Sequence, residues 1–134
     1  MIEVHGLDHV VLRTSRMDEM LHFYRDILGC PVERELSPEF GLVQLRAGTA
    51  LIDLVAVDSE LGRAGGGPPG ESGYNMDHFC LQLKPQAEEE IRSYLASQGV
   101  ETGPFERRYG AQGFGNSIYL RDPEGNTVEL RNRI

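Results

Sequence analysis

The sequence predicts an α+β fold built from two βαβββ modules, because one pattern occurs twice along the chain. The first copy is Leu7-Asp8-His9-Val10-Val11-Leu12 and the second is Met76-Asp77-His78-Phe79-Cys80-Leu81. The two histidines lie 69 positions apart, about half of the 134 residues. Each copy leads into an amphipathic helical pattern that ends at a glycine, Gly29 or Gly99. This period is too long for a solenoid and indicates two similar modules in one chain.

The first module is expected over about residues 5–57. Its opening segment, near residues 7–13, is apolar and contains β-branched valines, which predicts a buried strand. From Met17 to Leu28 the apolar residues recur at three- and four-residue intervals, which predicts a helix that Gly29 ends. Three further strands are expected, separated by turn-forming residues, at 31–36, 41–46 and 50–57.

The two modules are joined by a segment rich in glycine and proline, residues 58–75. It has too few apolar residues to form a regular element, so we expect a flexible linker or a mobile flap. The second module is then expected over residues 76–134. Its elements are a strand at 77–83, a helix at 86–98, and strands at 100–106, 117–121 and 127–131, with a tight turn at Asp122-Pro123-Glu124-Gly125-Asn126 between the last two.

Length and composition predict one domain, residues 1–134, in which the two modules share a core. The formal net charge of -8 disfavours nucleic acid and anionic membranes as partners, because binders of either usually carry a basic patch. The chain shows neither a signal-peptide pattern nor a long apolar run, and it contains only two cysteines. These features predict a cytoplasmic protein without disulfide bonds, whose partner is a small molecule.

Two histidines and two carboxylates occupy matched positions in the two modules. His9 and His78 begin the first strand of each module, and Asp53 and Glu129 lie among apolar residues in the last strand. A buried carboxylate is costly unless it is paired or bound to a cation. Imidazole nitrogen and carboxylate oxygen are suitable ligands for Zn, Ni, Co, Mn or Fe, so the pattern indicates one divalent metal ion. The alternative is that each residue is an ordinary hydrogen-bonded or solvent-facing side chain.

These segments resemble the vicinal oxygen chelate superfamily, which includes glyoxalase I, fosfomycin-resistance proteins, methylmalonyl-CoA epimerase, extradiol dioxygenases and bleomycin-resistance proteins. The resemblance covers essentially the whole chain and implies a curved, incomplete barrel. It is specific for the fold but not for the reaction. Its carriers are the two Asp-His segments, Phe23-Tyr24-Arg25-Asp26-Ile27-Leu28-Gly29 and Ser117-Ile118-Tyr119-Leu120-Arg121-Asp122-Pro123-Glu124-Gly125-Asn126-Thr127-Val128-Glu129-Leu130.

The resemblance implies metal ligation by His9, His78 and Glu129. Asp53 matches a position that is Glu in typical glyoxalase I and Gln in the epimerase. The shorter Asp is expected to bind the metal directly, to bind it through water, or only to contact the residues that bind it. The implied chemistry is a metal with open positions that holds two neighbouring substrate oxygens and stabilises an enolate or oxyanion. Glu129 or Asp53 is then the candidate catalytic base.

Two further residues are candidates for binding the substrate. Arg108 and Tyr109 precede a glycine-rich segment, 110–116, which resembles a loop near the site mouth in small glyoxalase-like proteins. Arg108 is suited to pair with a carboxylate or phosphate, or else is an ordinary solvated arginine. Tyr119 is expected to pack rather than to take part in chemistry.

The leading hypothesis is therefore a metal-dependent lyase or isomerase, similar to lactoylglutathione lyase, that acts on an oxygenated small molecule. One alternative is an Fe(II) extradiol-type dioxygenase, in which His9, His78 and Glu129 form a facial triad. Another is a metal-free antibiotic-binding or resistance protein of the same fold. Because open sheets leave unpaired edges, we expect a homodimer, and the same residues serve a site within one chain or shared across the dimer.

Overall fold

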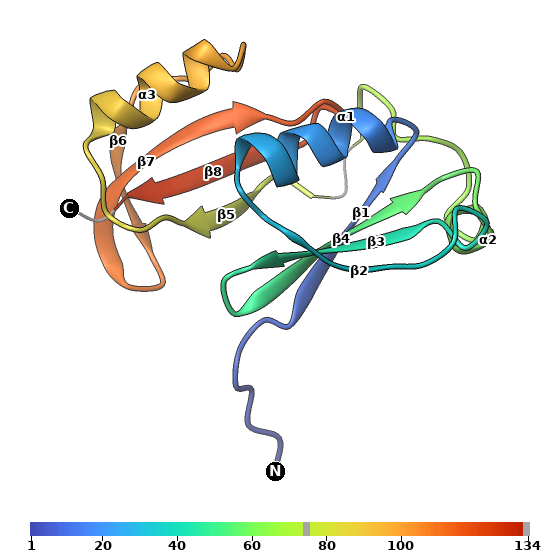
Figure 1. Cartoon of the computed structure of the whole chain (residues 1–134). Coiled ribbons are helices and arrows are strands. Elements are labelled where there is room, and N and C mark those ends of the chain that lie inside the picture. Colours follow the sequence, from blue (N-terminus) through green and yellow to red (C-terminus); the bar gives the residue numbers. More distant parts are fainter. Residues whose placement is uncertain (74–75, 133–134) are drawn as a thin grey trace. The chain divides into compact units, whose positions relative to one another are not determined.

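The computed structural model describes residues 1–73 and 76–132, which form two compact units, Met1–Gly70 and Glu71–Ile134 (Figure 1). The boundary between the units falls inside the predicted linker, 58–75. Residues 74–75 of that linker, and residues 133–134 of the predicted second module, lie outside the described residues. The organisation of residues 1–134 as one domain stays a prediction.

The first unit contains a four-stranded sheet in the order β1-β4-β3-β2. β1 is parallel to β4, and the other neighbouring strands are antiparallel. The helix after β1 begins as an α-helix and continues as a π-helical turn. The elements are β1 (His9–Thr14), α1 (Met17–Leu21), η1 (His22–Ile27), β2 (Val32–Glu35), β3 (Leu42–Ala47), β4 (Ala50–Ala56) and α2 (Glu60–Arg63).

The second unit repeats this topology with the strand order β5-β8-β7-β6 and with β5 parallel to β8. Its elements are β5 (Phe79–Gln82), α3 (Glu88–Ser97), β6 (Glu106–Gly110), β7 (Gly113–Arg121) and β8 (Thr127–Asn132). The predicted α+β class and the paired βαβββ modules are therefore confirmed. Each sheet is open, because its first and last strands do not pair with each other among the described residues.

In each unit, alternation along the strands gives the sheet one apolar face and one face that mixes polar and apolar side chains. On β4, Ile52 and Leu54 are buried apolar residues on either side of Asp53. On β8, Val128 and Leu130 flank Glu129 in the same way. The helices contribute further buried side chains to the core of their units, among them Met20, Phe23, Tyr24, Ile91 and Leu95. Asp53 and Glu129 therefore lie on the face of each sheet opposite these apolar residues.

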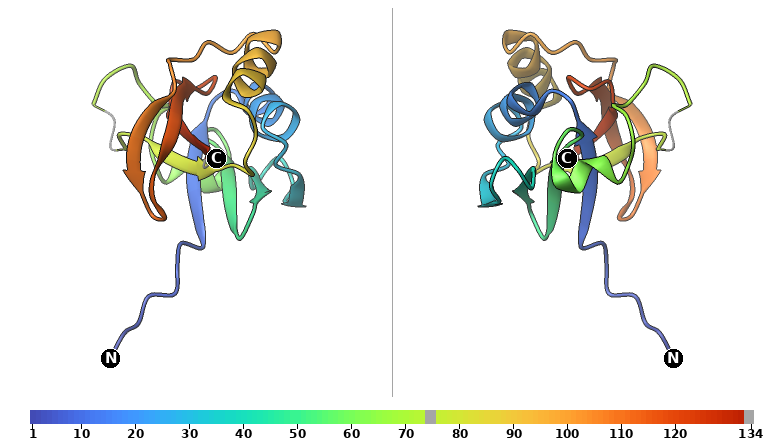
Figure 2. Two further views of the ribbon diagram at one scale, coloured as in Figure 1. Left: turned by 90° about the vertical axis from the view of Figure 1, so that its left-hand side faces the viewer. Right: turned by 90° about the vertical axis from the view of Figure 1, so that its right-hand side faces the viewer.

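The start of α3 is fixed to the second sheet on the apolar side. The Asn132 side chain donates to the Gln86 carbonyl at 2.7 Å and accepts from the Gln86 amide at 3.1 Å. Asn116, on the neighbouring strand, donates to the Glu88 carboxylate. Figure 2 shows α3 beside the strands of this unit. The opposite face, which carries Glu129, is thus left for other contacts.

The predicted strand at 100–106 is wrong. Of these residues only Thr102, in an isolated bridge to Leu120, and Glu106, the first residue of β6, pair with the sheet. The cause is local, because Pro104 lacks a backbone donor and Gly103 adds no packing side chain. The segment expected as a glycine-rich loop instead forms the β6–β7 hairpin, in which Arg108 pairs with Gly115 and Tyr109 with Phe114.

The predicted linker also contains a short helix, α2. Ser59 caps it, because its hydroxyl accepts from the Gly62 amide at 3.1 Å and donates to the Ala56 carbonyl at 2.6 Å. Arg13 holds the segment that follows, donating to the carbonyls of Gly62, Gly66 and Gly67 at 2.7–3.2 Å. Among the described residues, no helix is long and apolar enough to cross a membrane.

Gly62 provides a test of this capped turn. A Cβ at Gly62 would overlap the Ala56 carbonyl oxygen, so the backbone must shift. Although Ala is normally the better helix former, we expect Gly62→Ala to lower the free energy of unfolding by about 1–3 kcal/mol. Chemical denaturation measures this. Gly67→Ala is the matched control, because no heavy atom lies within 4 Å of its added Cβ; equal stability of the two variants would contradict the assignment.

Candidate functional site

The four predicted ligands fall into two equivalent pairs, one in each unit. In the first unit, His9 is the first residue of β1, and Asp53 lies on the adjacent strand β4. In the second unit, His78 immediately precedes β5, and Glu129 lies on the adjacent strand β8. The repeated topology therefore places an imidazole and a carboxylate on neighbouring strands twice.

The pair in the second unit is in direct contact. His78 Nε2 lies 3.1 Å from Glu129 Oε1, while His78 Nδ1 lies 2.7 Å from Asp77 Oδ2. Glu129 is buried and only 6% exposed, whereas the Asp77 side chain is almost fully exposed. The ring therefore links an outer carboxylate to a buried one.

The pair in the first unit is arranged similarly but less closely. His9 Nδ1 lies 2.7 Å from Asp8 Oδ1. The hydrogen bond to Asp8, opposed by desolvation and supported by the charge of Asp53, raises the pKa of His9. Asp53 is buried, and the Gln44 amide donates to both of its carboxylate oxygens at 3.2 Å. A neutral amide therefore orients the Asp53 carboxylate without neutralising its charge.

The Asp-His sequence has the same physical role in both units. A carboxylate beside Nδ1 favours the forms of the ring in which Nδ1 carries a proton, namely one neutral tautomer and the protonated imidazolium. In the neutral ring this leaves the lone pair on Nε2, and it holds the ring in one orientation. Asp8 and Asp77, which the sequence showed only as part of the repeat, are thus positioning residues for His9 and His78.

Glu129 lies in a polar environment that favours its charged form. Burial raises the pKa of Glu129, but hydrogen bonds from Ser117 and Tyr119 and the charges of His78 and Arg108 lower it. The net effect is a pKa of Glu129 below its ordinary value. The carboxylate is therefore ionised at neutral pH and available to a cation.

Two neighbours of Glu129 were not among the predicted site residues. The ring of Tyr119, expected to pack, lies edge-on to His78 with centroids 5.3 Å apart. Burial and then the Glu129 charge raise the pKa of Tyr119. Cys80 pairs with Glu129 across the β5–β8 ladder, and desolvation together with this carboxylate raises the pKa of the Cys80 thiol to about 12. The sequence signal for both is strand alternation, which places them on the Glu129 face.

Of the two predicted substrate-binding residues, Arg108 lies near Glu129 and Tyr109 points elsewhere. The Arg108 guanidinium donates to the Ser117 carbonyl at 2.7 Å and to Glu106 at 2.9 Å, and it lies 4.4 Å from the centre of the Tyr119 ring. Tyr109 is 74% exposed, and its ring lies edge-on to that of Phe114. Adjacent strand residues face opposite ways, so a binding role for Tyr109 stays a prediction.

Among the described residues, no group of three or more His, Cys, Asp and Glu side chains gathers as a metal-binding cluster. The candidate ligands come instead as the two pairs. The chemistry of each pair fits a divalent transition metal, because a neutral imidazole nitrogen and an ionised carboxylate oxygen are both accepted ligands. The 3.1 Å contact of His78 Nε2 with Glu129 shows two such donors directed at each other.

The chain is similar to proteins of known structure over nearly its whole length. It is 29% identical over 126 residues to the virulence protein STM3117 of Salmonella typhimurium, covering 92% of this chain and 81% of that protein. The integron cassette protein VCH_CASS1 of V. cholerae shares 25% identity with a TM-score of 0.74, and the alignment covers 98% of both chains. A lactoylglutathione lyase from Agrobacterium tumefaciens has the same fold, with 24% identity, a TM-score of 0.69, and coverage of 96% of this chain and 94% of that one.

The family model for the Glyoxalase/Bleomycin resistance protein/Dioxygenase superfamily matches residues 6–130. This match extends from just before the first Asp-His pair to just beyond Glu129 and includes both copies of the repeated topology. The chain therefore belongs to the Glyoxalase/Bleomycin resistance protein/Dioxygenase superfamily.

Proposed function

We propose that this protein is a divalent-metal-dependent lyase or isomerase of the glyoxalase-like group, acting on an oxygenated small molecule. The proposed ligands are His9, His78 and Glu129, with Asp53 as a fourth ligand or a residue that acts through bound water. Glu129 or Asp53 is the proposed catalytic base. The protein is proposed to work as a homodimer.

The observation that carries this proposal is the repeated Asp-His-carboxylate arrangement. In each unit, an Asp lies 2.7 Å from Nδ1 of the neighbouring His. In the second unit, His78 Nε2 lies 3.1 Å from Glu129, a buried, ionised carboxylate. Burial of an ionised carboxylate is costly unless partners satisfy it, and a metal ion would add a cation to the protein groups that already stabilise Asp53 and Glu129. Metal binding would neutralise both Asp53 and Glu129.

A divalent ion held by these residues would act as a Lewis acid on two neighbouring substrate oxygens and would stabilise an enolate or oxyanion. The protein groups have separate tasks. Asp8 and Asp77 orient the two imidazoles, and Tyr119 and Ser117 position the Glu129 carboxylate. Arg108, beside Tyr119, supplies a positive charge for an anionic group of the substrate.

The metal content of the purified protein tests the ligand set. We expect a divalent metal ion in protein purified without chelators, and we expect His78→Ala to reduce it to background because Nε2 is a ligand. Elemental mass spectrometry measures the bound ion. His22→Ala is the matched control, because His22 is an exposed helix residue paired with Asp26. Iron as the bound ion would favour the dioxygenase alternative.

Metal-free protein that takes up none of Zn, Ni, Co, Mn or Fe on reloading would overturn the proposed function. Ligand sequestration without metal would then be the better explanation.

The proposed base chemistry has an independent readout. Metal-loaded protein incubated in D2O with small α-hydroxy carbonyl compounds should exchange the proton on the carbon next to the carbonyl, which 1H NMR detects. Glu129→Gln should abolish this exchange because the amide cannot accept the proton. Glu101→Gln, at an exposed position outside the strands, should leave it unchanged. Absence of exchange for every compound in the metal-loaded protein would argue against enolate chemistry.

The Asp-His contact also predicts a titration. The pKa of His9 is raised chiefly by Asp8, so Asp8→Asn should lower the pKa of His9 in chelator-treated protein. The sign follows from the charge: Asp8 favours the protonated ring, and its loss favours the neutral one. Side-chain NMR of the imidazole as a function of pH measures this. Asp18→Asn, on the exposed side of α1, is the control. An unchanged His9 pKa would show that Asp8 does not position the ring.

A further inference from the structure

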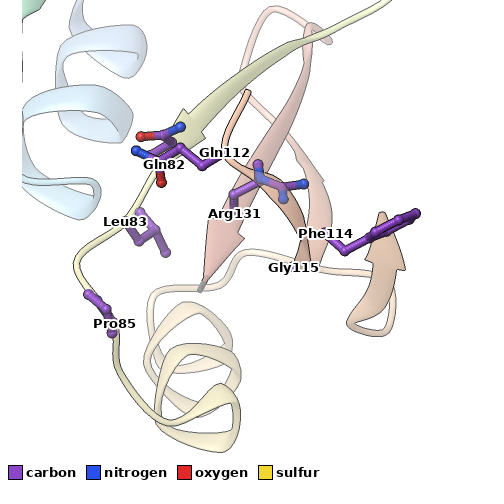
Figure 3. Close-up of a pocket in the computed structure, with 7 residues that line it drawn as sticks. All are labelled: Gln82, Leu83, Pro85, Gln112, Phe114, Gly115 and Arg131. Atoms are coloured by element: carbon purple, nitrogen blue, oxygen red, sulfur yellow. The ribbon is translucent and has the colours of Figure 1, made fainter. Parts of the chain in front are cut away.

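A pocket of about 380 Å³ lies within the second unit, where β5 and β8 end (Figure 3). Its walls include Leu83 and Pro85 on one side and the side chains of Gln82, Gln112 and Arg131. Figure 3 shows Gln82 and Gln112 next to Arg131, with the Phe114 ring pointing away from them. The pocket thus combines an apolar wall with a cation and two amides, and none of the described residues that line it carries a carboxylate.

Arg131 is a buried cation that no carboxylate of the described residues pairs with. It is 3% exposed, and its Nη1 and Nη2 groups donate to the carbonyls of Arg108 and Gly113 at 3.2 and 2.6 Å. Its Nε has no hydrogen-bond partner, and Arg131 takes part in no ion pair among the described residues. Glu129, two residues earlier on the same face, is engaged by His78, Ser117, Tyr119 and Arg108. In the part of the chain that the structure describes, only backbone carbonyls accept hydrogen bonds from the Arg131 guanidinium.

The glycine-rich hairpin provides the space that this guanidinium occupies. A Cβ at Gly110 would lie 2.7 Å from Arg131 Cζ and 2.8 Å from its Nε. Any larger residue at position 110 would therefore displace the guanidinium. The hairpin therefore both leaves room for the guanidinium at Gly110 and binds it through the carbonyls of Arg108 and Gly113.

We propose that this pocket binds the carboxylate of a small organic acid, with Arg131 as the countercharge and Leu83 and Pro85 against the hydrocarbon part. A buried unpaired cation is unfavourable, and a carboxylate is one of the anions whose geometry suits a guanidinium. The apolar wall favours an organic acid over an inorganic anion. The volume of about 380 Å³ is that of a site for a small molecule.

The position of the pocket connects it to the candidate metal ligands. Arg131 and Glu129 are separated by one residue on β8 and face the same way, about 7 Å apart along the strand. The lining of the pocket includes neither Glu129 nor His78, so Arg131 is the residue that joins the pocket to the face of β8 that carries Glu129. This assignment rests on the proposed function for its chemical meaning, because it gives the substrate class: an oxygenated small molecule that carries a carboxylate.

Benzoate is a suitable probe, since it combines a carboxylate with an apolar body. We expect benzoate to shift the Arg131 side-chain Nε–H signal in 1H–15N NMR spectra of the full-length protein, both after EDTA treatment and after metal loading. Benzamide, which has the same shape without the charge, should leave that signal unchanged. Inorganic phosphate and sodium chloride at matched ionic strength separate a carboxylate site from a general anion site.

Two variants complete the test. Arg131→Gln should abolish the benzoate-dependent shifts of the surrounding backbone amides. Arg131 also donates to backbone carbonyls, so Arg131→Gln can fail to fold, and Gln82→Glu then provides the test. Gln82 is exposed and pairs with Arg131 across the β5–β8 ladder. A carboxylate there should weaken benzoate binding about tenfold, because it would pair with Arg131 and repel the ligand. Arg92→Gln, which removes an exposed cation from α3, should bind benzoate like the wild type.

No benzoate-dependent shift in either form of the protein, or equal affinity in Gln82→Glu and the wild type, would overturn the inference. A response to phosphate but not to benzoate would overturn the organic-acid assignment. The chelator-treated sample separates the two proposals: binding there with no metal uptake supports the pocket and refutes the metal site. Metal uptake without benzoate binding refutes the pocket alone.

Discussion

A buried carboxylate in the middle of a strand is the constraint on which the rest of this structure depends. Asp53 and Glu129 each lie between two apolar core residues and are only 5% and 6% exposed. Burial of an ionised carboxylate is unfavourable unless partners satisfy it. The polar faces of both sheets are composed accordingly, with Gln44 beside Asp53, and with His78, Ser117 and Tyr119 beside Glu129.

The same constraint explains why the sequence predicted so much of the fold. A strand that buries apolar side chains on one face and carries functional side chains on the other must alternate between the two kinds of residue. In a repeated module this alternation occurs twice, in the same order. The two Asp-His segments, the helix-ending glycines and the Asp122–Asn126 turn follow from such local rules, and the structure contains each of them. In the turn, the Asp122 carboxylate accepts from the amides of Glu124 and Asn126 at 2.9 Å.

What the sequence did not predict depends on contacts distant along the chain. The segment 110–116 has the glycine content of a loop, yet it belongs to a hairpin because β6 pairs with β7 from Glu106 to Gly110. From the sequence, Arg131 is expected to be a surface residue. In the structure it is buried, and its guanidinium donates to the backbone carbonyls of Arg108 and Gly113 on the distant hairpin. The contact of Tyr119 with His78 likewise joins residues that are distant along the chain.

The two carboxylates are not equivalent, and their difference bears on what each can do. Glu129 has an imidazole 3.1 Å from one oxygen, and hydrogen bonds and positive charges hold its pKa below the ordinary value despite burial. Asp53 is one methylene shorter, and a neutral amide bonds to both of its oxygens. Because a carboxylate has about four lone-pair positions, Gln44 leaves Asp53 able to accept further donors or a cation. The amide fixes its orientation without cancelling its charge, so a cation on this face is favoured by Asp53 whether it binds directly or through water.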